Sequence, residues 1–231
     1  MIMEELDEGQ HTHDDVVVAI DGPAGSGKST VARAVAERVN LRHLDTGAIY
    51  RALALALLRQ GVPPEDADAV AVAAKSADIA LELAPGRSGA VRVLLDGSVM
   101  GDELRSAEVS RSVSAVSAVG AVREQLIALQ RAVISLGGIV AEGRDIGAVV
   151  WPQAEVKVFL TADAAERARR RAGGESADAL ALRDRLDSGR AASPTRAAPD
   201  ALVIDSTGRE VTDIVEEIVD LIATARAGRD R

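Results

Sequence analysis

Short runs of apolar residues alternate along this chain with longer segments in which apolar residues recur every three or four positions. Runs of the first kind are typical of strands buried on both faces, and segments of the second kind are typical of amphipathic helices. Their alternation predicts an α/β fold, in which helices cover both faces of a parallel sheet. Strands are predicted at residues 16–20, 42–44, 138–141, 156–160 and 201–205. Helices are predicted at residues 30–40, 48–60, 65–77, 105–136 with a break at Gly120, 163–171 and 211–227.

The pattern changes in the segment of about residues 78–101. Residues 80–83 and 91–95 alternate apolar and polar side chains as hairpin strands do, and Asp96-Gly97 is a turn signal before a third short strand. We therefore expect a small antiparallel insert of three strands within the parallel fold.

The ends and the composition of the chain limit what it can be. Residues 1–15 are acidic and lack apolar periodicity, which predicts a disordered tail, and residues 16–231 are predicted to form a single domain. Cysteine is absent, which excludes disulfides and thiolate metal sites. No apolar run approaches the ~18 residues of a membrane span, so we expect a cytoplasmic protein without a membrane partner. The net charge of −9 argues against a nucleic-acid polymer as ligand.

The first predicted strand runs into a P-loop pattern, which is a glycine, any four residues and then Gly-Lys-Ser. The glycines allow the backbone angles and the close approach that a loop around a triphosphate requires. Lys28 can reach the β- and γ-phosphates of ATP, and the Ser29 hydroxyl can hold Mg²⁺, the expected cofactor. The predicted ATP ligands are Gly22, Pro23, Ala24, Gly25, Ser26, Gly27, Lys28, Ser29 and Thr30.

Two arginines are predicted to face this loop. Arg51 lies two turns into the helix after the second strand, and Arg144 follows the third strand directly. Because ligands bind at the carboxyl ends of the strands in an open α/β sheet, both should converge on the P-loop. Two arginines there suit an anionic acceptor that approaches another anion. Glu142 either holds a water on Mg²⁺ or is a solvated loop acid.

Longer motifs follow one another in the chain after the P-loop. They are Asp45-Thr46-Gly47-Ala48-Ile49-Tyr50-Arg51, Glu142-Gly143-Arg144-Asp145-Ile146-Gly147, Arg183-Asp184-Arg185-Leu186-Asp187-Ser188-Gly189-Arg190 and Asp205-Ser206-Thr207. Together with the P-loop, and in this order, they resemble the bacterial cytidylate kinases, a family of P-loop nucleoside monophosphate kinases. The resemblance extends from Val16 to the last helix and includes a three-stranded insert in the region that binds the nucleoside monophosphate.

The resemblance implies transfer of the γ-phosphoryl group of ATP to CMP or dCMP by a monomeric enzyme. Arg51 and Arg144 would clamp the acceptor phosphate and, with Lys28, act in catalysis. The family assigns the cytosine contacts to Thr46, Ser114, Arg123 and Asp145. It assigns the ribose contacts to Arg183, Asp187 and Arg190. A short lid at about residues 167–190 would contribute Arg170 to ATP binding.

Simpler interpretations stay open at this point. Arg51 and Asp145 could form a structural ion pair, and Asp187 and Arg190 could be an i,i+3 helix pair. Ser114 lies among serines at positions 110, 112 and 117, so a slip of one turn would change which of them faces the base.

The alternative functions are a kinase for a different small acceptor and a non-catalytic ATP-dependent switch. Residues 172–182 are a truncated lid segment by the standard of the family, which bears on turnover more than on substrate identity.

Overall fold

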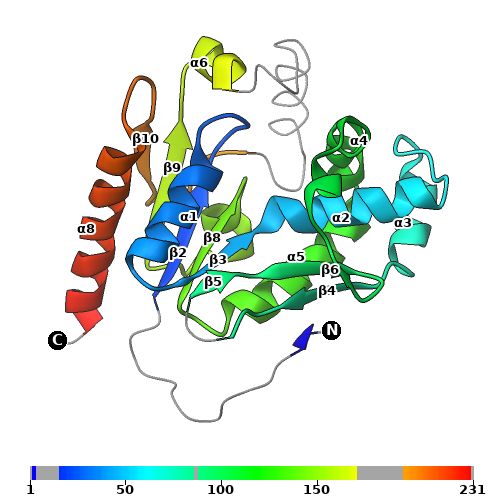
Figure 1. Ribbon diagram of the computed structural model, residues 1–231, viewed down its shortest axis with the longest axis horizontal. Coiled ribbons are helices and arrows are strands. Elements are labelled where there is room, and N and C mark those ends of the chain that lie inside the picture. Colours follow the sequence, from blue (N-terminus) through cyan, green and yellow to red (C-terminus); the bar gives the residue numbers. More distant parts are fainter. Residues whose placement is uncertain (1, 4–15, 86–87, 171–194, 230–231) are drawn as a thin grey trace.

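The computed structural model describes residues 2–3, 16–85, 88–170 and 195–229. Its centre is a six-stranded parallel sheet in the order β10-β9-β2-β8-β3-β5, with helices on both faces (Figure 1). The predicted α/β class is therefore confirmed. The strands are β2 (Val17–Asp21), β3 (Arg42–Asp45), β5 (Gly89–Ala90), β8 (Ile139–Gly143), β9 (Val156–Thr161) and β10 (Leu202–Asp205). Only β5 lies where no strand of this sheet was predicted, because a two-residue strand has no detectable periodicity.

The register of the sheet brings three strand ends together. Asp21 at the end of β2 lies opposite Gly143 of β8, and Asp45 at the end of β3 lies opposite Glu142. The loops that follow β2, β3 and β8 therefore leave the sheet at one edge, where open α/β sheets bind ligands.

Alternating residues of β2, together with Val16 directly before it, face two separate hydrophobic cores. Val16, Val18 and Ile20 pack in the core formed with α1 (Lys28–Arg38) and α8 (Val211–Arg229). Val17 and Ala19 belong to the other core, which includes α2 (Thr46–Arg59), α5 (Gly120–Ile134) and the insert. Burial on both faces explains why this central strand is a continuous apolar run. In Figure 1 the two helical layers lie on opposite sides of the sheet.

The predicted insert is present as the antiparallel strands β4 (Ile79–Glu82), β6 (Arg92–Leu95) and β7 (Ser98–Val99). Its tight turn has positive φ at Asp96 (51°) and Gly97 (74°), as the Asp-Gly signal predicted. A fourth strand, β1 (Ile2–Met3), lies parallel beside β4. The prediction of a disordered tail is thus wrong for these two residues, because strand pairing with a distant segment leaves no local pattern. Residues 4–15 lie outside the described part of the chain.

The remaining elements connect these layers. They are α3 (Ala67–Ala74), the 3-10 helix η1 (Asp102–Arg105), α4 (Ala107–Ala118), the π-helical turn η2 (Ile146–Val150) and α6 (Ala164–Arg170). The predicted break before Gly120 is real, since α4 and α5 meet there at 98°. The π-helical turn was not predicted. Among the described helices none alone is long and apolar enough to cross a membrane, and α4 with α5 reaches that length only as a bent pair.

Candidate active site

The loop between β2 and α1 has the backbone shape that the P-loop pattern predicts. Gly25 and Gly27 have φ of 77° and 89°, in the left-handed region that favours glycine. A side chain on Gly22 would place its Cβ only 2.1 Å from the Leu160 carbonyl oxygen of β9. Because α1 begins at Lys28, its first backbone N–H groups and the positive end of its dipole face the loop. The loop is therefore built to receive phosphate.

Three cationic side chains converge on the backbone of this loop from three different elements. Lys28 Nζ lies 3.1 Å from the Pro23 carbonyl oxygen. Arg144, after β8, donates to the Gly22 carbonyl at 2.7 Å. Arg167 of α6 donates to the Ala24 carbonyl at 3.2 Å. Their positive charges would neutralise the negative charges of a bound triphosphate.

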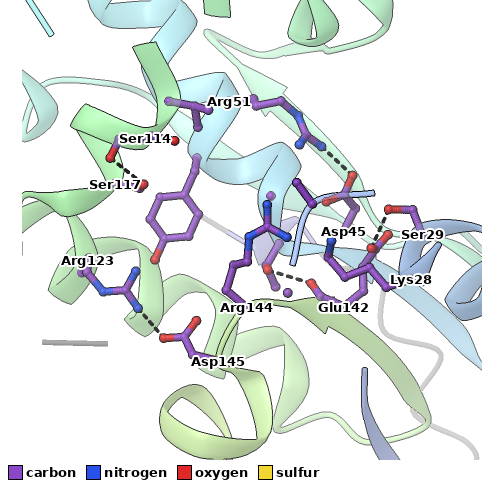
Figure 2. A pocket seen from close by; sticks show the side chains of 16 residues that line it. Lys28, Ser29, Asp45, Arg51, Ser114, Ser117, Arg123, Glu142, Arg144 and Asp145 are labelled. Atoms are coloured by element: carbon purple, nitrogen blue, oxygen red, sulfur yellow. Dashed lines mark hydrogen bonds and ion pairs between the residues drawn. The ribbon is translucent and has the colours of Figure 1, made fainter. Parts of the chain in front are cut away.

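Ser29 and Glu142, the two predicted metal ligands, are in direct contact. The Ser29 hydroxyl donates to Glu142 Oε2 at 2.6 Å (Figure 2). His43 Nε2 lies 3.1 Å from Glu142 Oε1. Glu142 is only 2% exposed, so the interpretation of this residue as a solvated loop acid is wrong. A hydroxyl and a carboxylate oxygen are ligands that Mg²⁺ prefers, directly or through water.

Arg51 is held by an acid of its own motif. Its Nη2 lies 2.6 Å from Asp45 Oδ2, while Asp45 Oδ1 accepts from the Ala48 N–H at 3.0 Å and caps α2. Burial opposes ionisation of Asp45, but Arg51, His43 and the Ala48 N–H together lower its pKa. The postulated structural ion pair of Arg51 with Asp145 is therefore wrong, and the Arg51 side chain lines the cavity in a fixed orientation.

Asp145 pairs instead with Arg123 of α5. Arg123 Nη2 lies 2.5 Å from Asp145 Oδ2, and the two residues are 4% and 5% exposed. The Arg123 guanidinium also lies over the Tyr50 ring, 5.8 Å from its centroid. A buried charge pair is costly unless it has a specific role or excellent partners.

Two serines of α4 and a threonine of α2 complete this wall. Ser114 and Ser117 both line the cavity, and the Ser117 hydroxyl donates to the Ser114 carbonyl at 3.1 Å (Figure 2). The serine predicted to face the base is thus present, but Ser117 lies one turn away in the same wall. Thr46 Oγ1 donates to the Glu142 carbonyl at 2.8 Å, which joins α2 to the end of β8.

One cavity brings most of the predicted residues together. Its lining includes Lys28, Ser29, Thr46, Arg51, Ser114, Arg123, Glu142, Arg144 and Asp145. The predicted ribose ligands Arg183, Asp187 and Arg190 and most of the predicted lid lie outside the described residues.

Comparison with known proteins assigns this constellation to a family. The sequence model of the cytidylate kinases matches residues 18–224. The chain belongs to the cytidylate kinase family. It is 47% identical to a cytidylate kinase of Symbiobacterium thermophilum, over 89% of this chain and 95% of that protein. It is also 47% identical to a cytidylate kinase of Mycobacterium avium, over 90% of this chain and 95% of the relative. The resemblance inferred from the motifs is thereby confirmed.

A solved structure extends the comparison to the fold. A gluconokinase from Sinorhizobium meliloti aligns with a TM-score of 0.52 and 13% identity, over 94% of this cytidylate kinase family member and 97% of that chain. At this sequence identity the likeness shows a shared P-loop kinase fold and carries no information on the phosphoryl acceptor.

A second cavity lies on the other side of the P-loop of this cytidylate kinase family member. It is lined by residues of α1, α6 and the segment after β10, including Gly27, Thr30, Arg170 and Ser206. Arg170 donates from Nη1 to the Ser206 hydroxyl at 2.9 Å and from Nη2 to its carbonyl at 2.8 Å. Arg170 therefore lies beside the P-loop, whereas the Arg169 side chain is 74% exposed.

Sequence reasoning missed several residues that line or support the first cavity. They are Asp21, His43, Asp45, Tyr50 and Ser117. Asp45 had a usable signal, because an Asp directly before a predicted helix is a typical N-cap, whose side chain accepts from the backbone N–H three positions on. Tyr50 was interpreted as a packing residue only. Nothing local distinguishes Asp21 or His43, since their partners lie about 100 or more positions away.

Proposed function

We propose that this protein transfers the γ-phosphoryl group of ATP to CMP or dCMP, giving ADP and CDP or dCDP. The observation on which the proposal rests is the buried Arg123–Asp145 pair in a cavity that also opens on the P-loop residues Lys28 and Ser29. One wall can recognise a base, and the opposite wall can hold a triphosphate.

The donor phosphates would lie in the P-loop. Its backbone N–H groups and Lys28 supply positive charge, and Arg167 adds a cation from α6. Ser29 and Glu142 would hold Mg²⁺, which would supply positive charge beside the transferred phosphate. Arg170 would contact the phosphates of ATP from the second cavity, beside the P-loop.

The acceptor phosphate would lie between Arg51 and Arg144. Asp45 fixes the first guanidinium, and the Gly22 carbonyl fixes the second one against the P-loop. Arginine is suited to this role because its planar fork binds two phosphate oxygens at once. Both guanidinia are oriented before a substrate arrives, so little of the binding free energy is lost in ordering them.

Cytosine would be recognised by charge complementarity. The Asp145 carboxylate accepts from the N4 amine, while Arg123 and Ser114 donate to the ring acceptors. Uracil has a carbonyl oxygen in place of that amine, so the same carboxylate would face an acceptor. Thr46 closes this part of the cavity, and Arg183, Asp187 and Arg190 are proposed to hold the ribose.

The transfer itself needs no dedicated general base. The attacking group is an oxygen of the CMP phosphate, which is largely ionised near neutral pH because its second pKa is about 6. A bond forms between this oxygen and the γ-phosphorus as the bond to the β-phosphate oxygen breaks, and ADP leaves with the electron pair. The protein contributes position and charge neutralisation.

Acceptor selectivity tests the proposal. CMP, dCMP, UMP and AMP are each titrated into the protein with Mg·ATP, and ADP release is followed. We expect CMP and dCMP to be good acceptors and UMP to be ten- to a hundredfold poorer, since a mispaired buried polar group costs about 1–3 kcal/mol. Equal use of UMP would refute the cytosine site. Release of ADP with a different acceptor alone would indicate another kinase, and ATP binding without any turnover would indicate a switch.

A further inference from the structure

Asp21 is a buried carboxylate that does not itself line the cavity, although its neighbour Gly143 in β8 does. It is the last residue of β2, 3% exposed, directly before P-loop residue Gly22. It follows Val17 and Ala19 on the face of the strand that looks toward η2. There its two oxygens accept separate bonds, from the Ile146 N–H at 2.7 Å and the Gly147 N–H at 2.8 Å.

These two amides begin the π-helical turn η2, immediately after the acceptor-site residues Arg144 and Asp145. The far end of η2 is anchored separately, because Arg131 of α5 donates to the Val150 carbonyl at 2.9 Å and to the Val149 carbonyl at 3.0 Å. The turn is thus held at both ends. The Asp21 end ties it by hydrogen bonds to the strand that leads into the P-loop.

The chemistry of this contact indicates that a carboxylate is required here to hold the two amides in place. Burial raises the pKa of Asp21 to about 7, although the Gly147 and Ile146 amides partly offset it. Of the nearby charged groups, Asp145 raises this pKa further and Lys28 lowers it. A buried acid of this kind weakens the fold at neutral pH, and selection for stability alone would favour a less costly residue. Only a carboxylate offers two acceptor oxygens at the spacing of two consecutive amides.

We propose that Asp21 is a positioning residue that sets the register between the donor loop and the acceptor loop. Its carboxylate ties the start of the P-loop to the turn that follows Arg144 and Asp145, so that the γ-phosphate and the acceptor phosphate meet in line. The proposal deepens the proposed function and rests on it. Asp21 itself contacts neither substrate.

An adenosine–cytidine pentaphosphate, a bisubstrate analogue that spans both sites, tests the register. In Asp21→Asn one oxygen remains as acceptor, and the new amide NH₂ opposes a backbone N–H. We expect this variant to bind CMP alone and ADP alone within about threefold of the wild type. The bisubstrate analogue should bind about 10- to 100-fold more weakly, and kcat should fall by a similar factor at little changed KM, because a misplacement of about 1 Å has effects of that size.

Arg131→Met is the matched control. It releases the other end of the same turn without touching the P-loop strand, so it should lower thermal stability but leave the ratio of bisubstrate to single-ligand affinity within about threefold of the wild type. An equal loss of this ratio in both variants would overturn the proposal, and so would an unchanged ratio in Asp21→Asn. A wild-type protein that binds ADP but not the bisubstrate analogue would overturn the proposed function and this role with it.

Hydrogen exchange on the wild type keeps the idea testable if Asp21→Asn does not fold. ADP alone would occupy the donor loop, and no residue of η2 lines either of the two cavities described above. We nevertheless expect it to slow exchange at the Ile146 and Gly147 amides several-fold, since their partner is fixed by the P-loop strand. Unchanged exchange at these amides in saturating ADP would show that the two loops are not coupled through Asp21.

Discussion

At the scale of single residues, the guanidinium groups of the cavity are each held by an acceptor outside the substrate. Asp45 holds Arg51, Asp145 holds Arg123, and the Gly22 carbonyl holds Arg144. Groups that are oriented in advance need no reorganisation when charge develops, which is the main source of electrostatic catalysis. The acids of this site therefore act through the arginines as much as on the substrate.

Lys28→Ala should reduce phosphoryl transfer by about 10³-fold or more, because the lysine neutralises charge at the transferred phosphate. The fold should persist, since Lys28 is only partly buried. Steady-state ADP release and circular dichroism measure the two effects. Lys75→Ala removes an exposed lysine at the end of α3 and should change neither. Near-normal turnover in Lys28→Ala would contradict the role of the P-loop.

Asp145→Asn should narrow the discrimination between CMP and UMP, because the amide NH₂ can donate to the uracil carbonyl where the carboxylate cannot. The ratio of kcat/KM for the two acceptors measures this. Asp45→Asn makes the same chemical change beside Arg51 and should lower kcat/KM equally for both acceptors. If Asp145→Asn and wild type show the same ratio, another group recognises the base.

The raised pKa of Asp21 predicts a pH-dependent stability. The carboxyl has a pKa of about 7 in the folded state and about 3.8 in the unfolded state, so between these pH values it is protonated mainly in the folded protein. Its contribution to stability therefore falls as the pH rises from about 4 to about 7. The unfolding free energy of the wild type, relative to that of Asp21→Asn, should therefore fall by about 1 kcal/mol for each unit that the pH rises in this range. Urea unfolding at pH 5, 6, 7 and 8 measures it, and parallel curves would contradict it.

At the scale of elements, α6 is arranged around one acid. Glu166 accepts from Arg169 three positions on and from Arg170 four positions on, while Arg170 also reaches Ser206 after β10. The hydrogen bond from Arg169 is the main cause that lowers the pKa of Glu166 to about 2; desolvation opposes it, and the hydrogen bond from Arg170 lowers the pKa further. The acid is therefore ionised at neutral pH.

Glu166→Gln should therefore loosen Arg170 and raise the KM for ATP about three- to tenfold, with little change in kcat. The effect should be independent of pH between 6 and 9, because Glu166 does not titrate there. Initial rates at saturating CMP measure it. Arg169→Ala, which removes the exposed member of the cluster, is the control and should leave the KM for ATP near the wild-type value.

At the scale of the whole molecule, the site lies at the border of the two cores that share the central sheet. The P-loop leads into α1 of one core, and Arg51, Ser114 and Arg123 come from helices of the other. A ligand that contacts both sides stabilises the folded state by mass action, independently of catalysis.

CMP at a hundred times its dissociation constant should raise the free energy of unfolding by about 2.7 kcal/mol. For a chain of this size that corresponds to a rise in Tm of roughly 5–10 °C. Thermal unfolding with CMP, with ADP and with UMP at the same concentration measures the effect. UMP should raise Tm clearly less than CMP, and equal shifts would argue against a cytosine-specific site.

Local patterns determined the architecture and most of the candidate site. Apolar runs located five strands of the parallel sheet, and the change of period located the insert, because burial on two faces and burial on one face leave different signals within a few residues. The P-loop is a contiguous backbone motif, so its sequence suffices to recognise it. Motif order was enough to identify the family.

Only the tertiary structure decided which partners the polar groups take. Arg51 has Asp45 as its partner rather than Asp145, and Asp21 binds amides about 125 positions away. Strand β5 joins the main sheet, and Ile2–Met3 pairs with β4. These choices depend on distances between segments that meet only after the chain has folded, and a hydrogen bond to a remote backbone amide leaves no trace in the residues beside it. Sequence therefore determined the elements and the kinds of side chain, and packing determined their partners.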